Sequence, residues 1–154
     1  MNNDFRDILC EFIAEKVEFL LVGAYALAIH GIARATGDID LWVRPVPENA
    51  VRVWNALARF GAPVSDLTAA DLTTPGLIFQ IGVPPRRIDV ITSIDGVDFE
   101  QAWAARVEVN VDGITLTAIS REDLIRNKRA AGRPKDLADL ALLDEARLPD
   151  SNRE

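Results

Sequence analysis

Cysteine and histidine are nearly absent from the chain. Among its 154 residues there is one cysteine, Cys10, and one histidine, His30. A single cysteine cannot form an internal disulfide, and no Cys or His stands near Cys10 at metal-ligand spacing. The sequence therefore excludes a disulfide framework and predicts a free thiol at Cys10.

Long apolar runs are absent as well. No stretch approaches the roughly 20 apolar residues that a membrane span requires. The first residues, Met-Asn-Asn-Asp-Phe-Arg-Asp, lack the basic stretch and the apolar run of a secretory signal. We therefore expect a cytoplasmic protein with no membrane contact.

Positive charge is scarce over the chain as a whole. Lys and Arg together number 17 against 24 Asp and Glu, which gives a net charge of −7. An acidic surface repels the phosphate backbone of a duplex, so any contact with nucleic acid is expected to be local. One basic stretch would allow such a local contact, because only Glu122 and Asp123 oppose its positive charge. Its residues are Arg121, Arg126, Lys128, Arg129, Arg133 and Lys135.

What the chain does have is the composition of an ordinary globular domain. Of its residues, 49% are apolar and 27% are charged, as in soluble folded proteins. A chain of this length normally forms one compact core. We expect a single domain over residues 1–148 and a disordered tail over residues 149–154.

Apolar spacing divides the chain into alternating helices and strands. The segments with helical spacing or capping signals are 3–16, 24–32, 47–60, 99–105, 121–131 and a last helix that begins at Pro134. The segments with short apolar or alternating runs are the strands 18–22, 38–43, 77–81, 87–91, 107–111 and 114–118. Residues 62–75 are expected to be irregular.

Two short connections within this alternation predict hairpins. Strands 77–81 and 87–91 are joined by a link rich in Gly and Pro, and Asp112-Gly113 between 107–111 and 114–118 is a strong hairpin signal. Helices between strands favour parallel pairing, whereas hairpins give antiparallel pairs. The expected fold class is therefore α/β (α+β), with a mixed β-sheet flanked by helices.

Three carboxylates fall on strands of this predicted sheet. Residues i and i+2 of a strand project from one face, so Asp38 and Asp40 can converge on one ion, and Asp89 supplies a third carboxylate from strand 87–91. Three hard oxygen donors suit Mg²⁺, which keeps waters and substrate phosphates in its other positions. The alternative is that the acids lie on a solvent-exposed face and only aid solubility.

A strand-to-helix turn at Gly23 precedes the first two acids. The first N–H groups of the helix over 24–32 have no partner within that helix, and such groups form an anion site. We therefore expect a phosphate group between the Gly23 turn and the metal.

Residues 21–43 carry a pattern that is similar to a known signature. They read Leu-Val-Gly-Ala-Tyr-Ala-Leu-Ala-Ile-His-Gly-Ile-Ala-Arg-Ala-Thr-Gly-Asp-Ile-Asp-Leu-Trp-Val. A glycine with a small residue, followed by an acid-apolar-acid triplet, resembles the DNA polymerase beta-type nucleotidyltransferase superfamily. With Asp89 in Arg-Arg-Ile-Asp-Val-Ile and the segment 123–143, the chain resembles most the small bacterial branch related to abortive-infection and toxin–antitoxin nucleotidyltransferases.

The resemblance implies a fold, a reaction and a set of residues. The fold is the nucleotidyltransferase fold, and the reaction is transfer of a nucleoside monophosphate from a nucleoside triphosphate to an acceptor hydroxyl, with release of pyrophosphate. Asp38, Asp40 and Asp89 would be the catalytic residues and the ligands of Mg²⁺ (or Mn²⁺). Gly23 would form the turn on the phosphate side, with the backbone N–H of Ala24 beside it.

Four further residues are candidates for supporting roles. Arg34 and Thr36 stand just before the acid pair and are candidates for binding the nucleotide, although Arg34 would equally suit a helix end. Lys128 is a candidate phosphate contact, with a solvated helix face as the alternative. His30 is expected to be structural, because polymerase-like chemistry needs no histidine.

Three functional hypotheses stay open at this stage. The first is a Mg²⁺-dependent nucleotidyltransferase enzyme, acting on RNA, a protein or a small molecule and associated with a toxin–antitoxin system. The second is a degenerate nucleotidyltransferase module that binds a partner protein as an antitoxin would, because Ala24 offers no hydroxyl to a phosphate. The third is an RNA-directed toxin that uses the basic residues of 121–135.

Overall fold

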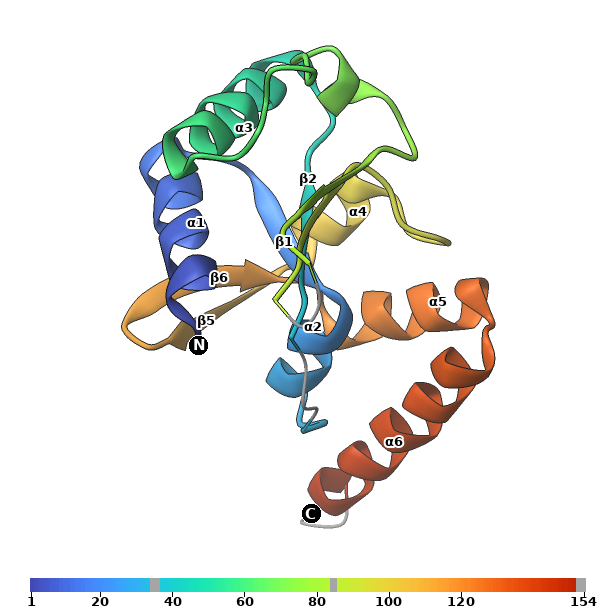
Figure 1. Cartoon of the computed structure of the whole chain (residues 1–154). Coiled ribbons are helices and arrows are strands. Elements are labelled where there is room, and N and C mark those ends of the chain that lie inside the picture. Colours follow the sequence, from blue (N-terminus) through green and yellow to red (C-terminus); the bar gives the residue numbers. More distant parts are fainter. Residues whose placement is uncertain (34–36, 84–85, 152–154) are drawn as a thin grey trace.

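The structure is a computed structural model, and it describes residues 1–33, 37–83 and 86–151 (Figure 1). The helices in it are α1 (Asn3–Ala14), α2 (Gly23–Ile29), α3 (Pro47–Phe60), the 3₁₀ turn η1 (Asp71–Thr73), α4 (Phe99–Ala104), α5 (Arg121–Ala131) and α6 (Pro134–Ser151). The strands are β1 (Phe19–Val22), β2 (Ile39–Val43), β3 (Ile78–Ile81), β4 (Ile88–Ile91), β5 (Val107–Val111) and β6 (Ile114–Ala118). Arg34 and Thr36 lie outside the described residues.

The six strands form one mixed sheet in the order β3-β4-β2-β1-β6-β5. Strand β2 pairs antiparallel with β1 and parallel with β4, and β1 pairs parallel with β6. The two expected hairpins, β3-β4 and β5-β6, are antiparallel pairs. The predicted fold class, a mixed sheet flanked by helices, is therefore confirmed.

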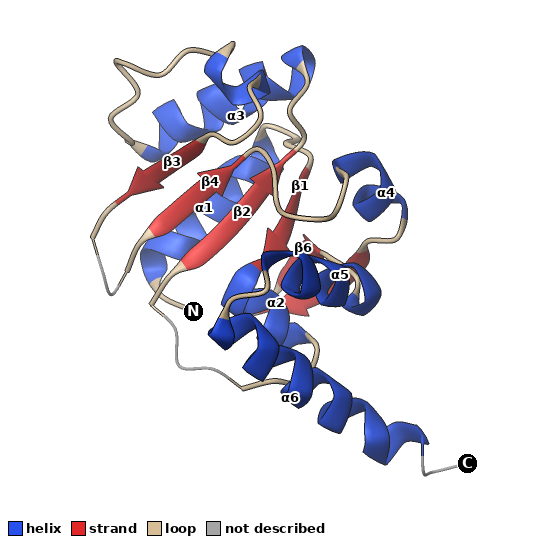
Figure 2. Cartoon of the chain, turned by 90° about the vertical axis from the view of Figure 1, so that its right-hand side faces the viewer, coloured by secondary structure: helices blue, strands red, loops and turns tan. Residues whose placement is uncertain are grey.

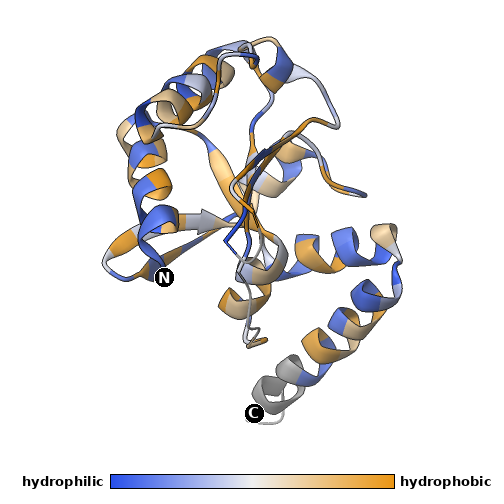
Figure 3. Cartoon of the chain, viewed as in Figure 1, coloured by the Kyte–Doolittle hydropathy of each residue, from blue (hydrophilic) through white to orange (hydrophobic). Residues whose placement is uncertain are grey.

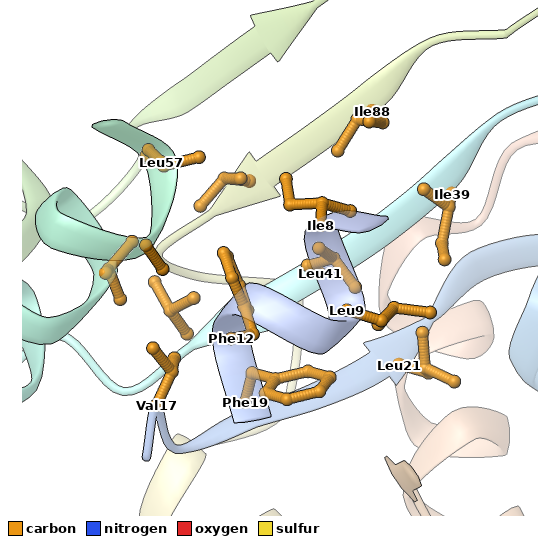
Figure 4. Close-up of a cluster of buried hydrophobic side chains, with 14 of the residues drawn as sticks. Ile8, Leu9, Phe12, Val17, Phe19, Leu21, Ile39, Leu41, Leu57 and Ile88 are labelled. Atoms are coloured by element: carbon orange, nitrogen blue, oxygen red, sulfur yellow. The ribbon is translucent and has the colours of Figure 1, made fainter. Parts of the chain in front are cut away.

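Helices cover both faces of the sheet. In Figure 2, α1 and α3 lie behind it, and α2, α4 and α5 lie in front. The rear face is the larger apolar core, where Ile8, Leu9 and Phe12 of α1 pack against Leu21 and Leu41 (Figure 4). Each of these side chains is at most 1% exposed. Burial of one such side chain contributes roughly 1.5–3 kcal/mol, so this face is a main source of stability.

Strand β2 divides its side chains between the two cores as its alternation predicts. Ile39 and Leu41 are buried in the rear core, whereas Trp42 lies in the front core against Phe99, with ring centroids 5.0 Å apart in an edge-to-face arrangement. Asp40 faces the same side as Trp42. At 1% exposed, Trp42 is therefore a packing residue of the front core.

Helices α5 and α6 form a hairpin at one end of the front face. The hydroxyl of Ser120 accepts a hydrogen bond from the Asp123 N–H at 3.1 Å and caps α5, and Gly132 ends α5 in the left-handed region with φ 63°. Both helices alternate between hydrophilic and hydrophobic segments (Figure 3), and the far part of α6 extends away from the sheet. No helix within residues 1–33, 37–83 and 86–151 has the length and apolarity to cross a bilayer.

Several predicted boundaries shift by one to three residues. Helix α1 ends at Ala14 rather than at residue 16, because Lys16 has a positive φ of 59° and the Val17 N–H turns back to the carbonyl of Phe12 at 2.9 Å. Helix α2 is also shorter than expected, since Gly31 has φ 97°. The stretch predicted to be irregular, 62–75, contains η1.

At the C-terminus, α6 continues to Ser151 and so includes the first part of the segment for which the sequence predicts disorder. Residues 152–154 lie outside the described residues, and the predicted tail stays a prediction.

Candidate active site

The register of the sheet brings two of the three predicted acids directly together. Asp40 of β2 is paired with Asp89 of β4, and on the other side of β2 the same residue is opposite Val22. The carboxyl groups of Asp40 and Asp89 share a hydrogen bond. Two acids that are 49 residues apart in the sequence therefore form one pair at the end of β1 where α2 begins.

Burial and mutual repulsion change the proton affinity of this pair. Burial, together with the negative charges of Asp89 and Asp38, raises the pKa of Asp40 to about 6, against the opposing effect of Arg87. Burial also raises the pKa of Asp89, which is 7% exposed. Two carboxyl groups held this close cannot both ionise freely. A bound cation or a shared proton would therefore stabilise the pair.

The third acid, Asp38, is turned toward Arg87. Its Oδ1 accepts a hydrogen bond from the Arg87 backbone N–H at 3.2 Å, and its Oδ2 lies 3.3 Å from Nη2 of the Arg87 guanidinium. Nε of the same guanidinium lies 3.2 Å from Oδ1 of Asp89. Arg87 therefore bridges two of the three acids, and in the part of the chain that the structure describes no three His, Cys, Asp or Glu side chains are gathered as a preformed metal cluster.

The chemistry of this acid pair nevertheless fits a divalent cation. Oδ1 of Asp89 is buried and, apart from its ion pair with Arg87, receives no hydrogen bond from the described residues, and a buried oxygen without a hydrogen bond is costly. Asp40 beside it has its pKa raised by burial and by two neighbouring carboxylates. Hard carboxylate oxygens are the ligands that Mg²⁺ and Mn²⁺ accept, so Asp40 and Asp89, joined by Asp38, can hold such an ion.

Gly23 is required by the position of Asp40. It has a φ of 68°, and a Cβ atom built on it would lie 2.1 Å from Oδ2 of Asp40. No larger residue fits there unless the carboxylate moves. Ala24 follows at the start of α2, and both residues line a pocket beside the acids.

This pocket has a volume of about 580 Å³ and lies between the sheet and the α5-α6 hairpin. One side carries the three acids and Arg87, and the other carries three basic residues: Lys128, Arg133 and Lys135. Its apolar wall is made by Ile78, Ile91 and Ile94. Asp139 also lines the pocket beside the basic residues, so each side carries both signs, with an excess of acids on one side and of bases on the other.

Lys128 lies in the pocket wall, but it is not on a solvated helix face. It is 6% exposed, and its Nζ lies 3.4 Å from Oδ1 of Asp136 and 3.1 Å from Oδ2 of Asp139. Burial lowers the pKa of Lys128, and the charge of Asp136 opposes that effect. An ammonium group has three N–H donors, so two carboxylates do not saturate it and a phosphate contact stays a prediction.

The remaining candidates of the sequence are placed in structural roles. His30 contacts the carbonyl of Ile119 through Nε2 at 2.8 Å, as expected for a structural histidine. In the basic stretch, Arg126 pairs with Asp123 at 2.6 Å and Arg133 pairs with Asp136 at 2.7 Å. These internal pairs leave the stretch less available to nucleic acid than its sequence indicates.

Sequence reasoning missed two contributions to this pocket. Arg87 stands directly before β4 and two residues before Asp89, so its spacing already placed it on the acidic face, but not in contact with both Asp38 and Asp89. Asp136 and Asp139 follow Lys128 by eight and eleven residues, and only the turn at Gly132 brings them to it. The first signal was present in the sequence, whereas the second depends on how α5 and α6 pack.

Solved structures that are similar to this chain include the following three proteins. A protein from Thermotoga maritima, described as a candidate nucleotidyltransferase, aligns with a TM-score of 0.61 at 17% identity, covering 92% of this chain and 91% of that one. The lincosamide antibiotic adenylyltransferase LnuA, with lincomycin bound, gives a TM-score of 0.58 at 17% identity, covering 95% of this chain and 98% of that one. An antigenic nucleotidyltransferase-like protein from Paracoccidioides brasiliensis gives 0.52 at 13% identity, over 91% and 74% of the two chains.

At these identities the structural matches show the fold alone, which is that of nucleotidyltransferases. Among curated proteins, none matches this chain in sequence. A family model described as "Nucleotidyltransferase of unknown function (DUF6036)" matches residues 5–146, which include the Gly23 turn, all three acids and the α5-α6 hairpin. The chain therefore belongs to this nucleotidyltransferase family and is a transferase enzyme.

Proposed function

We propose that the protein transfers a nucleoside monophosphate from a nucleoside triphosphate to an acceptor hydroxyl, with Mg²⁺ or Mn²⁺ as cofactor. The observation that carries this proposal is the pairing of Asp40 with Asp89 beside Gly23, across a pocket from Lys128. In the transfer, the acceptor oxygen forms a bond to the α-phosphorus while the bond to pyrophosphate breaks. The acids would act through the cation that they hold, and the lysine would offset phosphate charge directly.

Each predicted residue has a separate task in this proposal. Asp38, Asp40 and Asp89 would hold the divalent cation, whose contribution is to lower the pKa of the acceptor hydroxyl and to offset charge on the leaving oxygen. Lys128 would contact a phosphate as a point charge. Gly23 and Ala24 would lie beside the phosphates, and Arg34 and Thr36 are the remaining candidates for binding the nucleotide.

The pocket favours a small-molecule acceptor over RNA or protein. A volume of about 580 Å³ falls within the range of ordinary ligand sites. The apolar wall includes Ile78, whose 60% exposure leaves it free to contact a substrate, whereas the net charge of −7 disfavours a polyanionic acceptor. The relative LnuA is named as an adenylyltransferase of a small antibiotic, which is consistent with this choice.

Thermal unfolding with and without ligands tests the proposal. Wild type and the Asp38→Asn, Asp40→Asn double mutant would each be unfolded with every nucleoside triphosphate, with and without Mg²⁺. A ligand at 100 times its dissociation constant adds about 2.7 kcal/mol, or roughly 5–11 °C for a domain of this size. We expect a Mg²⁺-dependent rise in wild type that the double mutant lacks. An equal rise in both proteins would contradict the proposed cation site.

A partner-binding role without turnover is the second candidate, and one observation favours it. Arg87 pairs with Asp38 and Asp89, and two aspartates pair with Lys128, so the charges of the pocket are largely compensated by the chain itself. An antitoxin-like module would retain such a pocket without catalysing transfer in it. Co-purification of a stoichiometric partner, with no nucleotide-dependent rise in wild type, would favour this role within a toxin–antitoxin system over the enzyme.

A further inference from the structure

Arg87 occupies carboxylate oxygens that a divalent cation would need. Its guanidinium lies 3.3 Å from Oδ2 of Asp38 through Nη2 and 3.2 Å from Oδ1 of Asp89 through Nε. These two acids come from the ends of neighbouring strands, and the guanidinium lies between them. A divalent cation bound by both acids would therefore compete with the guanidinium for the same oxygens.

The backbone of Arg87 is fixed, so that only its side chain can exchange. Its carbonyl accepts a hydrogen bond from the Ile39 N–H at 3.0 Å, and its own N–H donates to Asp38 at 3.2 Å. The residue also stands directly before β4, whose four residues are paired with β2. Movement of the guanidinium would leave the strands and the acids in place.

The present pairing of the guanidinium is also incomplete. Nε of Arg87 and Oδ1 of Asp89 are close enough for an ion pair, yet neither atom has a well-directed hydrogen bond among the described residues. The Arg87 side chain as a whole is 31% exposed, but its Nε and Oδ1 of Asp89 are both buried. A buried ion pair offsets the desolvation of its charges only when its geometry is good, so this poorly directed pair favours exchange of the guanidinium for a cation.

The displaced guanidinium has a destination in the same pocket. Arg87 lines the pocket of about 580 Å³ that faces Lys128. A guanidinium presents several N–H donors in a planar fork and binds phosphate oxygens well. Once a cation holds the acids, the same side chain is placed to contact an anionic substrate.

We propose that Arg87 acts as the built-in counter-cation of the acids, is displaced from Asp38 and Asp89 by the divalent cation, and then contacts the triphosphate. Binding of the cation and binding of the nucleotide are thereby coupled through one side chain. The displacement concerns cation binding alone, whereas the contact with the triphosphate rests on the proposed function. The two parts are tested by different measurements.

The first test is a titration with Mn²⁺ alone, followed by the electron paramagnetic resonance signal of the free ion. Arg87→Gln removes the competing guanidinium, and Arg86→Gln, at an exposed neighbouring position, removes the same formal charge. We expect Arg87→Gln to bind Mn²⁺ at least about fivefold more tightly than wild type, and Arg86→Gln to stay within about twofold, because a charge in contact acts far more strongly than a screened one. Equal affinities of the two variants, or weaker binding by Arg87→Gln, would overturn the displacement.

The second test measures nucleotide affinity at saturating Mn²⁺, for each of the four nucleoside triphosphates. Arg87→Gln is expected to weaken the best nucleotide at least about tenfold, with Arg86→Gln within about twofold of wild type. Tighter Mn²⁺ binding with unchanged nucleotide affinity would overturn the contact with the triphosphate. Failure of wild type to bind any nucleotide would refute the proposed function instead, and the Mn²⁺ titration would still decide whether Arg87 is displaced.

A third variant keeps the proposal testable if Arg87→Gln does not fold, as checked by circular dichroism. Arg87→Lys keeps the charge but cannot bridge two carboxylates with a planar fork. We expect it to bind Mn²⁺ more tightly than wild type and to retain part of the nucleotide affinity. If Arg87 were purely structural, Arg87→Lys would instead bind Mn²⁺ with the same affinity as wild type.

Discussion

Gly23 and Asp40 are in such close contact that a methyl group on the one would collide with the carboxylate of the other. The Cβ of any residue at position 23 would lie 2.1 Å from Oδ2 and 3.1 Å from Cγ of Asp40. The residues belong to different elements, the start of α2 and the strand β2. The glycine of the family signature therefore acts here through the orientation of an acid, in addition to any contact with phosphate.

Gly23→Ala should remove cation-dependent nucleotide binding. The added methyl forces the Asp40 carboxylate to turn, and the positive φ of 68° adds roughly 1–2 kcal/mol of backbone strain. We expect a lower midpoint of unfolding and no rise with Mg²⁺ and nucleoside triphosphate. The matched control is Gly61→Ala, with φ 96° and no atom within 4 Å of its Cβ. Gly61→Ala should lose similar stability but keep the rise of its unfolding midpoint with Mg²⁺ and nucleotide. Loss of this rise in both variants would refute the steric argument.

The raised pKa of Asp40 should make stability fall as pH rises from about 4 to 6. Its pKa in the folded protein is about 6, against an ordinary value of 3.8 for an aspartate. The folded state therefore binds more protons than the unfolded state between these values, and its stability decreases with pH across that window. The difference corresponds to at most roughly 3 kcal/mol. Asp40→Asn should flatten the profile measured by urea unfolding, whereas the exposed Glu108→Gln should leave it unchanged.

The same proton should compete with the divalent cation. A carboxylate with a pKa of about 6 is mostly protonated at pH 5, so affinity for Mn²⁺ should fall by about tenfold between pH 7.5 and pH 5. Isothermal titration calorimetry at the two pH values measures the ratio. If affinity is independent of pH over this range, Asp40 is not a ligand of the ion.

Lys128 should be required for folding as well as for binding. Lys128→Met leaves Asp136, 0% exposed, and Asp139, 4% exposed, without a buried ammonium, and such a loss costs about 3–5 kcal/mol. Lys135→Met on the exposed side of α6 should change stability by no more than about 0.5 kcal/mol. Urea unfolding measures both free energies.

A triple variant separates the two tasks of Lys128. Lys128→Met combined with Asp136→Asn and Asp139→Asn removes the buried charges together, so most of the stability should return. Nucleotide affinity should stay low if Lys128 contacts a phosphate. Recovery of wild-type nucleotide affinity in this variant would show that the lysine is structural only.

Gly96 should control how closely α5 packs on the loop after β4. A Cβ at Gly96 would lie 2.5 Å from Cβ of Ala130, and Asn127 donates to the carbonyl of Asp95 at 3.0 Å in the same contact. Gly96→Ala should cost roughly 2–3 kcal/mol through overpacking and its positive φ. Ala130→Gly makes room for the methyl, so the double variant should lose at least about 1 kcal/mol less than the sum of the single losses. Additive losses would show that the two residues do not touch.

Much of this fold is local in origin and follows from spacing alone. Helix α3 has the predicted bounds, since Pro47 opens it and Gly61 ends it in the left-handed region. The β5-β6 hairpin forms around Asp112 and Gly113, both with positive φ, as the turn requires. The helix at α2 was predicted, but its early end at Ile29 and the 3₁₀ turn η1 were not. In such short segments, tertiary packing can override the structure that local spacing predicts.

The sequence by itself determined the three acids, the glycine turn and the mixed sheet, because alternation and turn chemistry act over a few residues. Only the tertiary structure decided which charges meet. It paired Asp40 with Asp89 through strand register, placed Arg87 between Asp38 and Asp89, and buried Lys128 between two aspartates of α6. Such contacts join residues that are up to 49 positions apart. They depend on the order of strands and the packing of helices, which no local pattern encodes.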